Sequence, residues 1–140
     1  MANPTTAPDV FEALRDLALP EADYAVFGSG PLIVRRIAPF ANDLDVVCRG
    51  AAWSYACQRG ELVHLDDHGV DVVSVLDGRI TIGRSWAYGT PDIDELIDTA
   101  ELINGLPFVR LSHVIEYKTI AGRPKDLAHL EALRAWHEPA

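Results

Sequence analysis

Two aspartates, Asp43 and Asp45, stand two residues apart in an apolar segment of the chain. Side chains alternate between the two faces of a strand, so these carboxylates would point the same way, about 7 Å apart. Ionised carboxylates that lie this close repel each other unless a cation lies between them. Oxygen ligands of this kind suit Mg²⁺. The pair therefore predicts a magnesium site.

A glycine-serine turn precedes the two aspartates. Gly28, Ser29 and Gly30 directly follow an apolar run. Glycine permits backbone turns whose N–H groups face an anion at the start of a helix. Gly28 and Ser29 are therefore candidate phosphate ligands. A carboxylate pair that binds metal beside a turn that binds phosphate is the arrangement that nucleotide chemistry needs.

The spacing of this segment, G-S, thirteen residues and then D-x-D, resembles the active-site signature of the DNA polymerase beta-like nucleotidyltransferase superfamily. A second segment, Val114 to Leu133, is similar to the lysine helix and the R-x-K-D-L segment of small bacterial members. These members include the minimal nucleotidyltransferases and toxins of the abortive-infection type. The resemblance implies an α+β nucleotidyltransferase fold, with a mixed β-sheet flanked by helices and two C-terminal helices.

The resemblance also implies a third acid on a strand beside the aspartate pair. Asp71 fits that place, because it stands alone in the apolar segment 70–76. A lone acid in such a strand is costly unless it faces solvent or a cation. The alternative is that Asp71 is an exposed residue of an edge strand.

The basic residues near the C-terminus are the candidate phosphate ligands of the second segment. By the resemblance Lys118 binds the nucleotide's phosphates; otherwise it is a surface lysine with a packed stem. Arg123 or Lys125 would lie near phosphate, with Asp126 holding one of them, or the three form a helix cap and a surface ion pair. His129 stands where related sequences commonly carry an acid.

The implied reaction moves a nucleoside monophosphate from an NTP, with ATP as the expected one, to an acceptor hydroxyl and releases pyrophosphate. Asp43, Asp45 and Asp71 would hold two Mg²⁺ ions that stabilise the attacking and leaving oxygens. The sequence leaves the acceptor open between a small molecule, an RNA and a protein. Two alternatives remain: a nucleotide-binding or interaction module without turnover, and the toxin of a toxin–antitoxin pair with a separately encoded partner. A homodimer is also left open.

Composition and charge fit a cytoplasmic enzyme with one domain. The chain has 140 residues and a net charge of −9, which disfavours a broad nucleic-acid surface but not a single nucleotide. No apolar run approaches the roughly 20 residues of a membrane span, and the first residues lack the pattern of a signal peptide. We expect a flexible tail over residues 1–8 and a single nucleotidyltransferase-like domain over 9–140.

Alternating helices and strands must position these residues. Helices are predicted at 9–19, 31–37, 51–58, 93–98 and 113–121 and from Pro124 onward, and strands at 24–28, 43–48, 61–65, 70–76, 79–83, 100–103 and 108–111. The dipeptides Asp77-Gly78 and Asn104-Gly105 predict two hairpins. Asp9 and Glu12 predict a capping box at the start of the first helix.

Three further groups carry alternatives. One of Arg35 and Arg36 is expected to pair with the carboxylates. His64 and His68, with two aspartates between them, are a possible metal cluster. They lie in a turn rather than on one face of a helix, so a metal cluster is the disfavoured alternative. Trp53, Trp86 and Trp136 are expected in the core or an interface, with base stacking by Trp86 and Tyr88 as the alternative.

Overall fold

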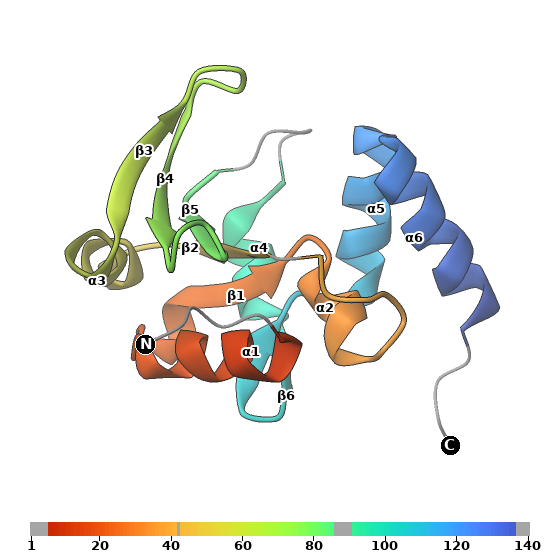
Figure 1. Ribbon diagram of the computed structural model, residues 1–140, viewed down its shortest axis with the longest axis horizontal. Coiled ribbons are helices and arrows are strands. Elements are labelled where there is room, and N and C mark those ends of the chain that lie inside the picture. The colour runs from red at the N-terminus through yellow and green to blue at the C-terminus, as the bar shows by residue number, and fades with distance from the viewer. Residues whose placement is uncertain (1–5, 42, 86–90, 137–140) are drawn as a thin grey trace.

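The computed structural model describes residues 6–41, 43–85 and 91–136. A central β-sheet carries helices on both faces (Figure 1). The helices of the described part are α1 (Ala7–Asp16), α2 (Gly30–Val34), α3 (Ala51–Arg59), α4 (Ile93–Asp98), α5 (Leu111–Ala121) and α6 (Pro124–Ala135), with a 3-10 turn at Glu21–Asp23. The strands are β1 (Tyr24–Phe27), β2 (Leu44–Cys48), β3 (Glu61–Leu65), β4 (Val70–Val75), β5 (Ile80–Gly83), β6 (Glu101–Ile103) and β7 (Leu106–Phe108).

The strands form one mixed sheet in the order β3-β4-β5-β2-β1-β7-β6. β1 runs antiparallel to β2 and parallel to β7, and β2 runs parallel to β5. The pairs β3–β4, β4–β5 and β6–β7 are antiparallel hairpins. The predicted combination of a mixed sheet, flanking helices and two C-terminal helices is confirmed.

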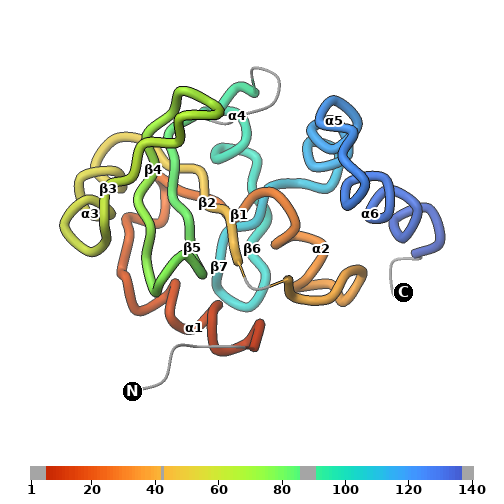
Figure 2. Tube along the Cα trace, turned by 45° about the horizontal axis from the view of Figure 1, so that its top comes forward, coloured from red at the N-terminus to blue at the C-terminus, as the bar shows by residue number. Residues whose placement is uncertain are grey.

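Two apolar clusters lie on the two faces of the sheet. On one face, Val10 and Leu14 of α1 and Ala52 and Ala56 of α3 pack against the strands. On the other face, helices α2, α4 and α5 pack over β1 and β2. Helices α5 and α6 lie side by side at one end of the molecule (Figures 1 and 2). The second face and this helix pair together frame the site described below.

The first helix begins earlier than its sequence pattern predicts. α1 starts at Ala7, inside the segment 1–8 that we expected to be a flexible tail. Its N-cap is Thr6, whose hydroxyl accepts a hydrogen bond of 3.3 Å from the backbone N–H of Asp9. The predicted capping box of Asp9 and Glu12 is therefore wrong, because a threonine three residues upstream is the cap.

Both hairpin predictions are confirmed. Asp77 and Gly78 have φ angles of 53° and 86°, and Asn104 and Gly105 have 52° and 80°. Positive φ at both central residues gives a turn whose twist matches that of the flanking strands. The tight turn at Asn104 starts β7 at Leu106, two residues before the predicted strand.

The last two helices are separated by two residues, Gly122 and Arg123. Gly122 lies in the left-handed region with φ 59° and ends α5, as its position predicts. α5 begins at Leu111, two residues before its predicted start, and Arg110 is its N-cap. None of the helices in the described part of the chain combines the length and the apolar character needed to span a bilayer.

Candidate active site

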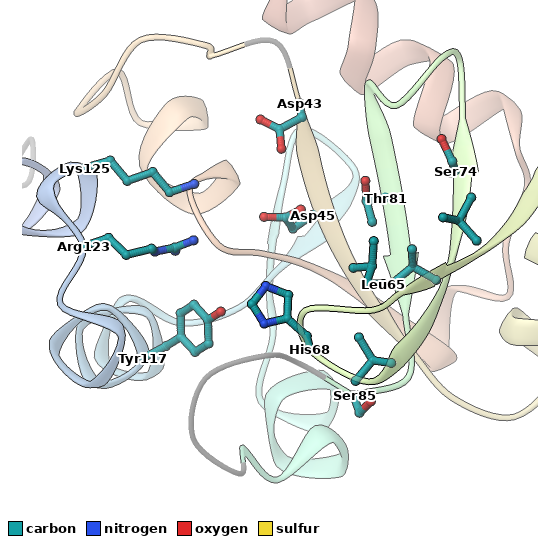
Figure 3. A pocket seen from close by; sticks show the side chains of 13 residues that line it. Asp43, Asp45, Leu65, His68, Ser74, Thr81, Ser85, Tyr117, Arg123 and Lys125 are labelled. Carbon is teal, nitrogen blue, oxygen red and sulfur yellow. The ribbon is translucent and has the colours of Figure 1, made fainter.

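A cleft of about 340 Å³ lies between the sheet and the helix pair α5–α6. Strands β2 to β5 form one wall, and the other wall comes from the end of α5 and the start of α6 (Figure 3). Its described lining consists of Asp43, Asp45, Val63, Leu65, His68, Val70, Val72, Ser74, Thr81, Ser85, Tyr117, Arg123 and Lys125. Four predicted site residues, the two aspartates, Arg123 and Lys125, therefore share one cleft.

The aspartate pair lies at the start of β2, as predicted. Asp45 pairs with Phe27 of β1 and with Thr81 of β5, so its side chain stands on the second face of the sheet. Burial raises the pKa of Asp45 to about 6, and the neighbouring Asp43 carboxylate raises it too, while Lys125, Arg123 and Lys118 act in the opposite direction. The two carboxylates are thus close enough to repel each other.

The glycine turn lies directly against Asp45. Gly28 has φ +60°, and a Cβ atom placed on it would lie 2.8 Å from Oδ2 of Asp45. A Cβ on Gly30 would overlap a methyl group of Val26. Both glycines are therefore required by contact, and the backbone of the turn reaches the carboxylate because no side chain separates them. Helix α2, which follows the turn, spans only five residues, so we assign no anion binding to its dipole.

Lys118 is buried and does not line the cleft. Its side chain is 1% exposed, and its ammonium group donates to Oδ1 of Asp126 at 3.2 Å and to Oγ of Ser29 at 3.3 Å. Oγ of Ser29 also lies 3.4 Å from Nδ1 of His129. The alternative of an exposed surface lysine is wrong, because Lys118 connects α5 to α6 and to the glycine turn.

Asp126 binds two cations at once. The buried carboxylate accepts a hydrogen bond of 2.6 Å from Nε of Arg123 at Oδ2, in addition to the one from Lys118. It also accepts the backbone N–H of Arg123 at 3.1 Å, which caps α6. The two readings of this segment, a helix cap and a carboxylate that holds a cation in place, therefore both describe Asp126.

The electrostatics of this cluster follow from its burial. Burial lowers the pKa of Lys118, and the hydrogen bond to Asp126 acts in the opposite direction. Burial would raise the pKa of Asp126, but hydrogen bonds from Arg123 and Lys118 outweigh it and the pKa lies below its ordinary value. Burial and the charge of Lys118 lower the pKa of His129. His129 is therefore the neutral member of the cluster near pH 7.

The structure does not bring Asp71 to the aspartate pair. Asp71 pairs with His64 across β3 and β4, and its Oδ1 lies 2.7 Å from Nδ1 of that histidine. Strand residues alternate, so Asp71 stands on the opposite face from Ser74, whose cross-strand partner is Thr81 beside Asp45. The expectation that Asp71 is a third ligand is wrong. Asp71 is exposed, as the alternative states, but β4 is the second strand of the sheet rather than its edge.

Two other expectations have a clear outcome, and a third concerns residues outside the described ranges. Arg35 lies 3.5 Å from Glu101 and donates to the carbonyl of Pro31, so it does not pair with the aspartates. Arg36 is exposed. In the described ranges, no group of three or more His, Cys, Asp or Glu side chains is arranged to hold a metal ion. The segment of His64 and His68 lies in these ranges and therefore forms no such cluster. Trp86 and Tyr88 lie outside the described residues.

Sequence reasoning missed the hydroxyl side chains beside Asp45. Thr81 of β5 is its cross-strand neighbour, and Ser74 of β4 is the next residue in the same row. The turn at Asp77-Gly78 was a usable signal, because residues equally distant from it pair across the hairpin. The pairing of β2 with β5 had no local signal.

No protein-family model and no curated protein matches the chain in sequence. The structure is similar to the crystal structure of a putative nucleotidyltransferase from Thermotoga maritima, with a TM-score of 0.53, 14% sequence identity and 94% of each chain covered. The two chains share a fold. The predicted α+β nucleotidyltransferase fold is thereby confirmed.

Proposed function

We propose that this chain transfers a nucleoside monophosphate from an NTP to an acceptor hydroxyl and releases pyrophosphate. The observation that carries the proposal is the arrangement of the cleft. Asp43 and Asp45, at the start of β2, face Arg123 and Lys125, at the start of α6 (Figure 3). Carboxylates on one wall and cations on the other suit a metal-bound triphosphate, because a metal needs oxygen ligands and phosphates need positive charge. The shared fold supports the same reaction class.

The donor set of the cleft fits one magnesium ion. Burial raises the pKa of Asp45, and the charge of the nearby Asp43 raises it further, so the two carboxylates repel each other when both are ionised. Mg²⁺ is commonly held by one or two carboxylates together with waters and substrate phosphates. Asp71 lies on the other face of the sheet, and the described residues offer no third carboxylate at the cleft. We therefore propose one ion rather than two. When bound, the ion would neutralise phosphate charge that develops during transfer.

The cations of α6 would bind and orient the phosphates. Asp126 fixes Arg123 by two side-chain hydrogen bonds. Lys125 is exposed on the first turn of α6 and lines the cleft. A fixed guanidinium suits oriented recognition of phosphate, whereas a lysine on a flexible stem acts as a point charge. We expect Arg123 to orient the triphosphate and Lys125 to add affinity.

The glycine turn would hold the phosphates from the side of α2. Ser29 accepts a hydrogen bond from Lys118, and its hydroxyl proton can be donated either to the nearby Nδ1 of His129 or to a phosphate. The backbone of Gly28 stands against Asp45 with no side chain between them. Lys118 would thus act on phosphate through Ser29, rather than as the direct ligand that the family resemblance implies.

Transfer of label from the α-phosphorus tests the proposal. The purified protein is incubated with Mg²⁺, a bacterial lysate and each of the four NTPs, labelled at either the α- or the γ-phosphorus. We expect a new α-labelled product with the wild type and with the exposed control Asp16→Asn on α1, and none with Asp45→Asn. The γ-label should appear in pyrophosphate alone. Transfer of the γ-label to an acceptor, or an unchanged product with Asp45→Asn, would contradict nucleotidyl transfer.

A nucleotide-binding module without turnover is the second candidate. The observation in its favour is the row beside Asp45, where Thr81 and Ser74 stand instead of a further acid. Such a module would bind ATP with Mg²⁺ in a calorimeter but leave every α-label on the nucleotide. The same two measurements therefore separate the candidates.

A further inference from the structure

The sheet face that carries Asp45 is covered over only part of its width. Within residues that the structure describes, the apolar cluster under α4 and α5 draws its strand residues from β1 and β2 and none from β3, β4 or β5. Over those three strands the same face forms the floor of the cleft, with Val63, Leu65, Val70, Val72, Ser74 and Thr81. An apolar surface left open beside charged residues is typical of a binding site.

The strand register makes this floor continuous with the carboxylates. Thr81 pairs with Asp45 and Ser74 pairs with Thr81, which gives a row of polar side chains. Ser74 pairs in turn with Glu61 of β3, and in the next rows of the same face Val72 pairs with Val63 and Val70 with Leu65. The floor therefore places aliphatic side chains directly beside the hydroxyls that adjoin Asp45 (Figure 3).

The direction of in-line displacement assigns this floor to the acceptor, if the proposed function holds. In such a reaction the attacking oxygen and the leaving oxygen lie on opposite sides of the phosphorus. Pyrophosphate would leave toward the cations Arg123 and Lys125 on the α6 wall. The acceptor hydroxyl would then approach from the opposite side of the aspartates, where Thr81 and Ser74 stand.

We propose that the open face of β3, β4 and β5 is the acceptor subsite, and that the acceptor is a small, uncharged or cationic molecule that presents a hydroxyl from an apolar body. This inference rests on the proposed function and names its substrate class. The acceptor oxygen forms a bond to the α-phosphorus while the bond from that phosphorus to the bridging oxygen breaks. The bridging oxygen keeps the electron pair and leaves with pyrophosphate, and the hydroxyl proton passes to water in the open cleft.

Size and charge both favour this class over a nucleic acid. The floor shares its cleft of about 340 Å³ with the metal and phosphate ligands, so the space left for the acceptor suits a small molecule. The hairpin that forms its outer part carries the exposed acids Glu61, Asp66 and Asp67, and the chain has a net charge of −9. Binding of an RNA acceptor would require cations along the phosphate backbone. An acidic rim instead repels a polyanion and attracts a cation.

The first experiment sorts the labelled product by size. After incubation of the full chain with α-labelled NTP, Mg²⁺ and lysate, we expect the label in a fraction below about 1 kDa that resists nuclease and protease. Label that disappears with ribonuclease or with protease would overturn the proposed substrate class. Absence of any α-labelled product would instead overturn the proposed function, so the two failures are distinguishable.

The second experiment tests the subsite without turnover. N-phenyl-1-naphthylamine, an uncharged fluorescent dye, is titrated into the wild type and into Val63→Thr and Val70→Thr, which keep the branched shape of the side chain. We expect roughly fivefold to tenfold weaker binding for each, because a polar group replaces one methyl on the floor. Leu62→Thr is the matched control: it lies on β3 beside Val63 but on the other face, and should bind as the wild type does.

The same dye titration identifies the occupant of the floor. If the floor receives the acceptor, a saturating non-hydrolysable ATP analogue with Mg²⁺ should leave dye binding within about twofold, because the two ligands occupy adjacent positions. Competitive displacement of the dye would show that the nucleobase occupies the floor and would overturn the proposal. Equal dye affinity of the wild type and both threonine variants would overturn it as well.

Discussion

The ammonium group of Lys118 lies 3.2 Å from Oδ1 of Asp126, and both side chains are excluded from solvent. Arg123 shares the same carboxylate at 2.6 Å. One negative charge is therefore held between two cations, and a single buried contact links α5, α6 and, through Lys118, the serine of the glycine turn. The cluster keeps one net positive charge beside the cleft, while the carboxylate fixes the direction of Arg123.

The first prediction is that two substitutions in this cluster lower the free energy of unfolding by different amounts. Asp126→Asn leaves Lys118 buried with no carboxylate, so we expect a loss of about 3–5 kcal/mol in the free energy of unfolding. Lys118→Met leaves Asp126 paired with Arg123, so the loss should be smaller, about 1–3 kcal/mol. Urea unfolding followed by circular dichroism measures both. The double variant should lose less than the sum of the two, and strict additivity would contradict a direct pair.

The second prediction concerns the charge of Asp45 in the absence of metal. Its pKa rises from 3.8 to about 6 on folding, so the folded state binds this proton more tightly than the unfolded chain. Ionised Asp45 therefore opposes folding, and its cost grows as the pH rises from about 4 to 6. Asp45→Asn should raise the free energy of unfolding by about 2–3 kcal/mol at pH 7.5, since a tenfold change in proton affinity is worth about 1.4 kcal/mol.

The pH dependence checks this explanation. Most of the gain from Asp45→Asn should disappear near pH 4, where the carboxyl is protonated in the folded state and, with an ordinary pKa of 3.8, about 40% protonated in the unfolded chain. Unfolding is measured in EDTA at both pH values, and the exposed Asp67→Asn serves as the control. Mg²⁺ should raise the melting temperature of the wild type and leave that of Asp45→Asn unchanged. A gain that is equal at both pH values would mean that packing, not charge, is responsible.

Much of the site could be predicted from the sequence because its signals are local. The Gly28 turn and the aspartate pair lie within one stretch of chain, and the predicted contact between them is present. Arg123 and Lys125 could be placed near the cleft only through the family resemblance, since no local pattern relates them to β2. The structure then brought them to the same cleft.

The error at Asp71 has a physical cause. Strand 70–75 is apolar on both faces, with Val73 and Val75 on one and Val70 and Val72 on the other. Alternation therefore did not reveal which face meets Asp45, and a shift of one residue reverses every side chain. The burial of Lys118 was also beyond local signals, because it depends on a contact with Asp126 across the junction of two helices.

The third prediction concerns Gly28. Gly28→Ala adds a methyl group at φ +60°, which costs about 1–2 kcal/mol, and places it 2.8 Å from Oδ2 of Asp45. Gly69→Ala is the matched control, since Gly69 has φ +65° and no atom within 4 Å of the added carbon. Both variants should lose similar stability from the backbone. Only Gly28→Ala should weaken Mg²⁺ binding, measured by calorimetry, by roughly tenfold, and equal Mg²⁺ affinity of the two variants would contradict contact with the metal site.

The last prediction separates the two cations that line the cleft. Lys125 is exposed and contributes positive charge to Asp45 without belonging to the buried cluster, so Lys125→Ala should leave the free energy of unfolding within about 0.5 kcal/mol. It removes a charge-assisted contact to phosphate, worth about 1.5–3 kcal/mol, and should weaken binding of Mg²⁺ with an ATP analogue roughly tenfold or more.

Arg123→Ala should weaken binding as well, but it also removes a partner of buried Asp126 and should lower stability. Arg134→Ala, on the same helix and exposed, controls for the loss of a cation and should change neither quantity. Calorimetry and urea unfolding of the three variants give both measurements. Unchanged nucleotide affinity in Lys125→Ala would remove α6 from the phosphate site and leave the glycine turn as the remaining candidate.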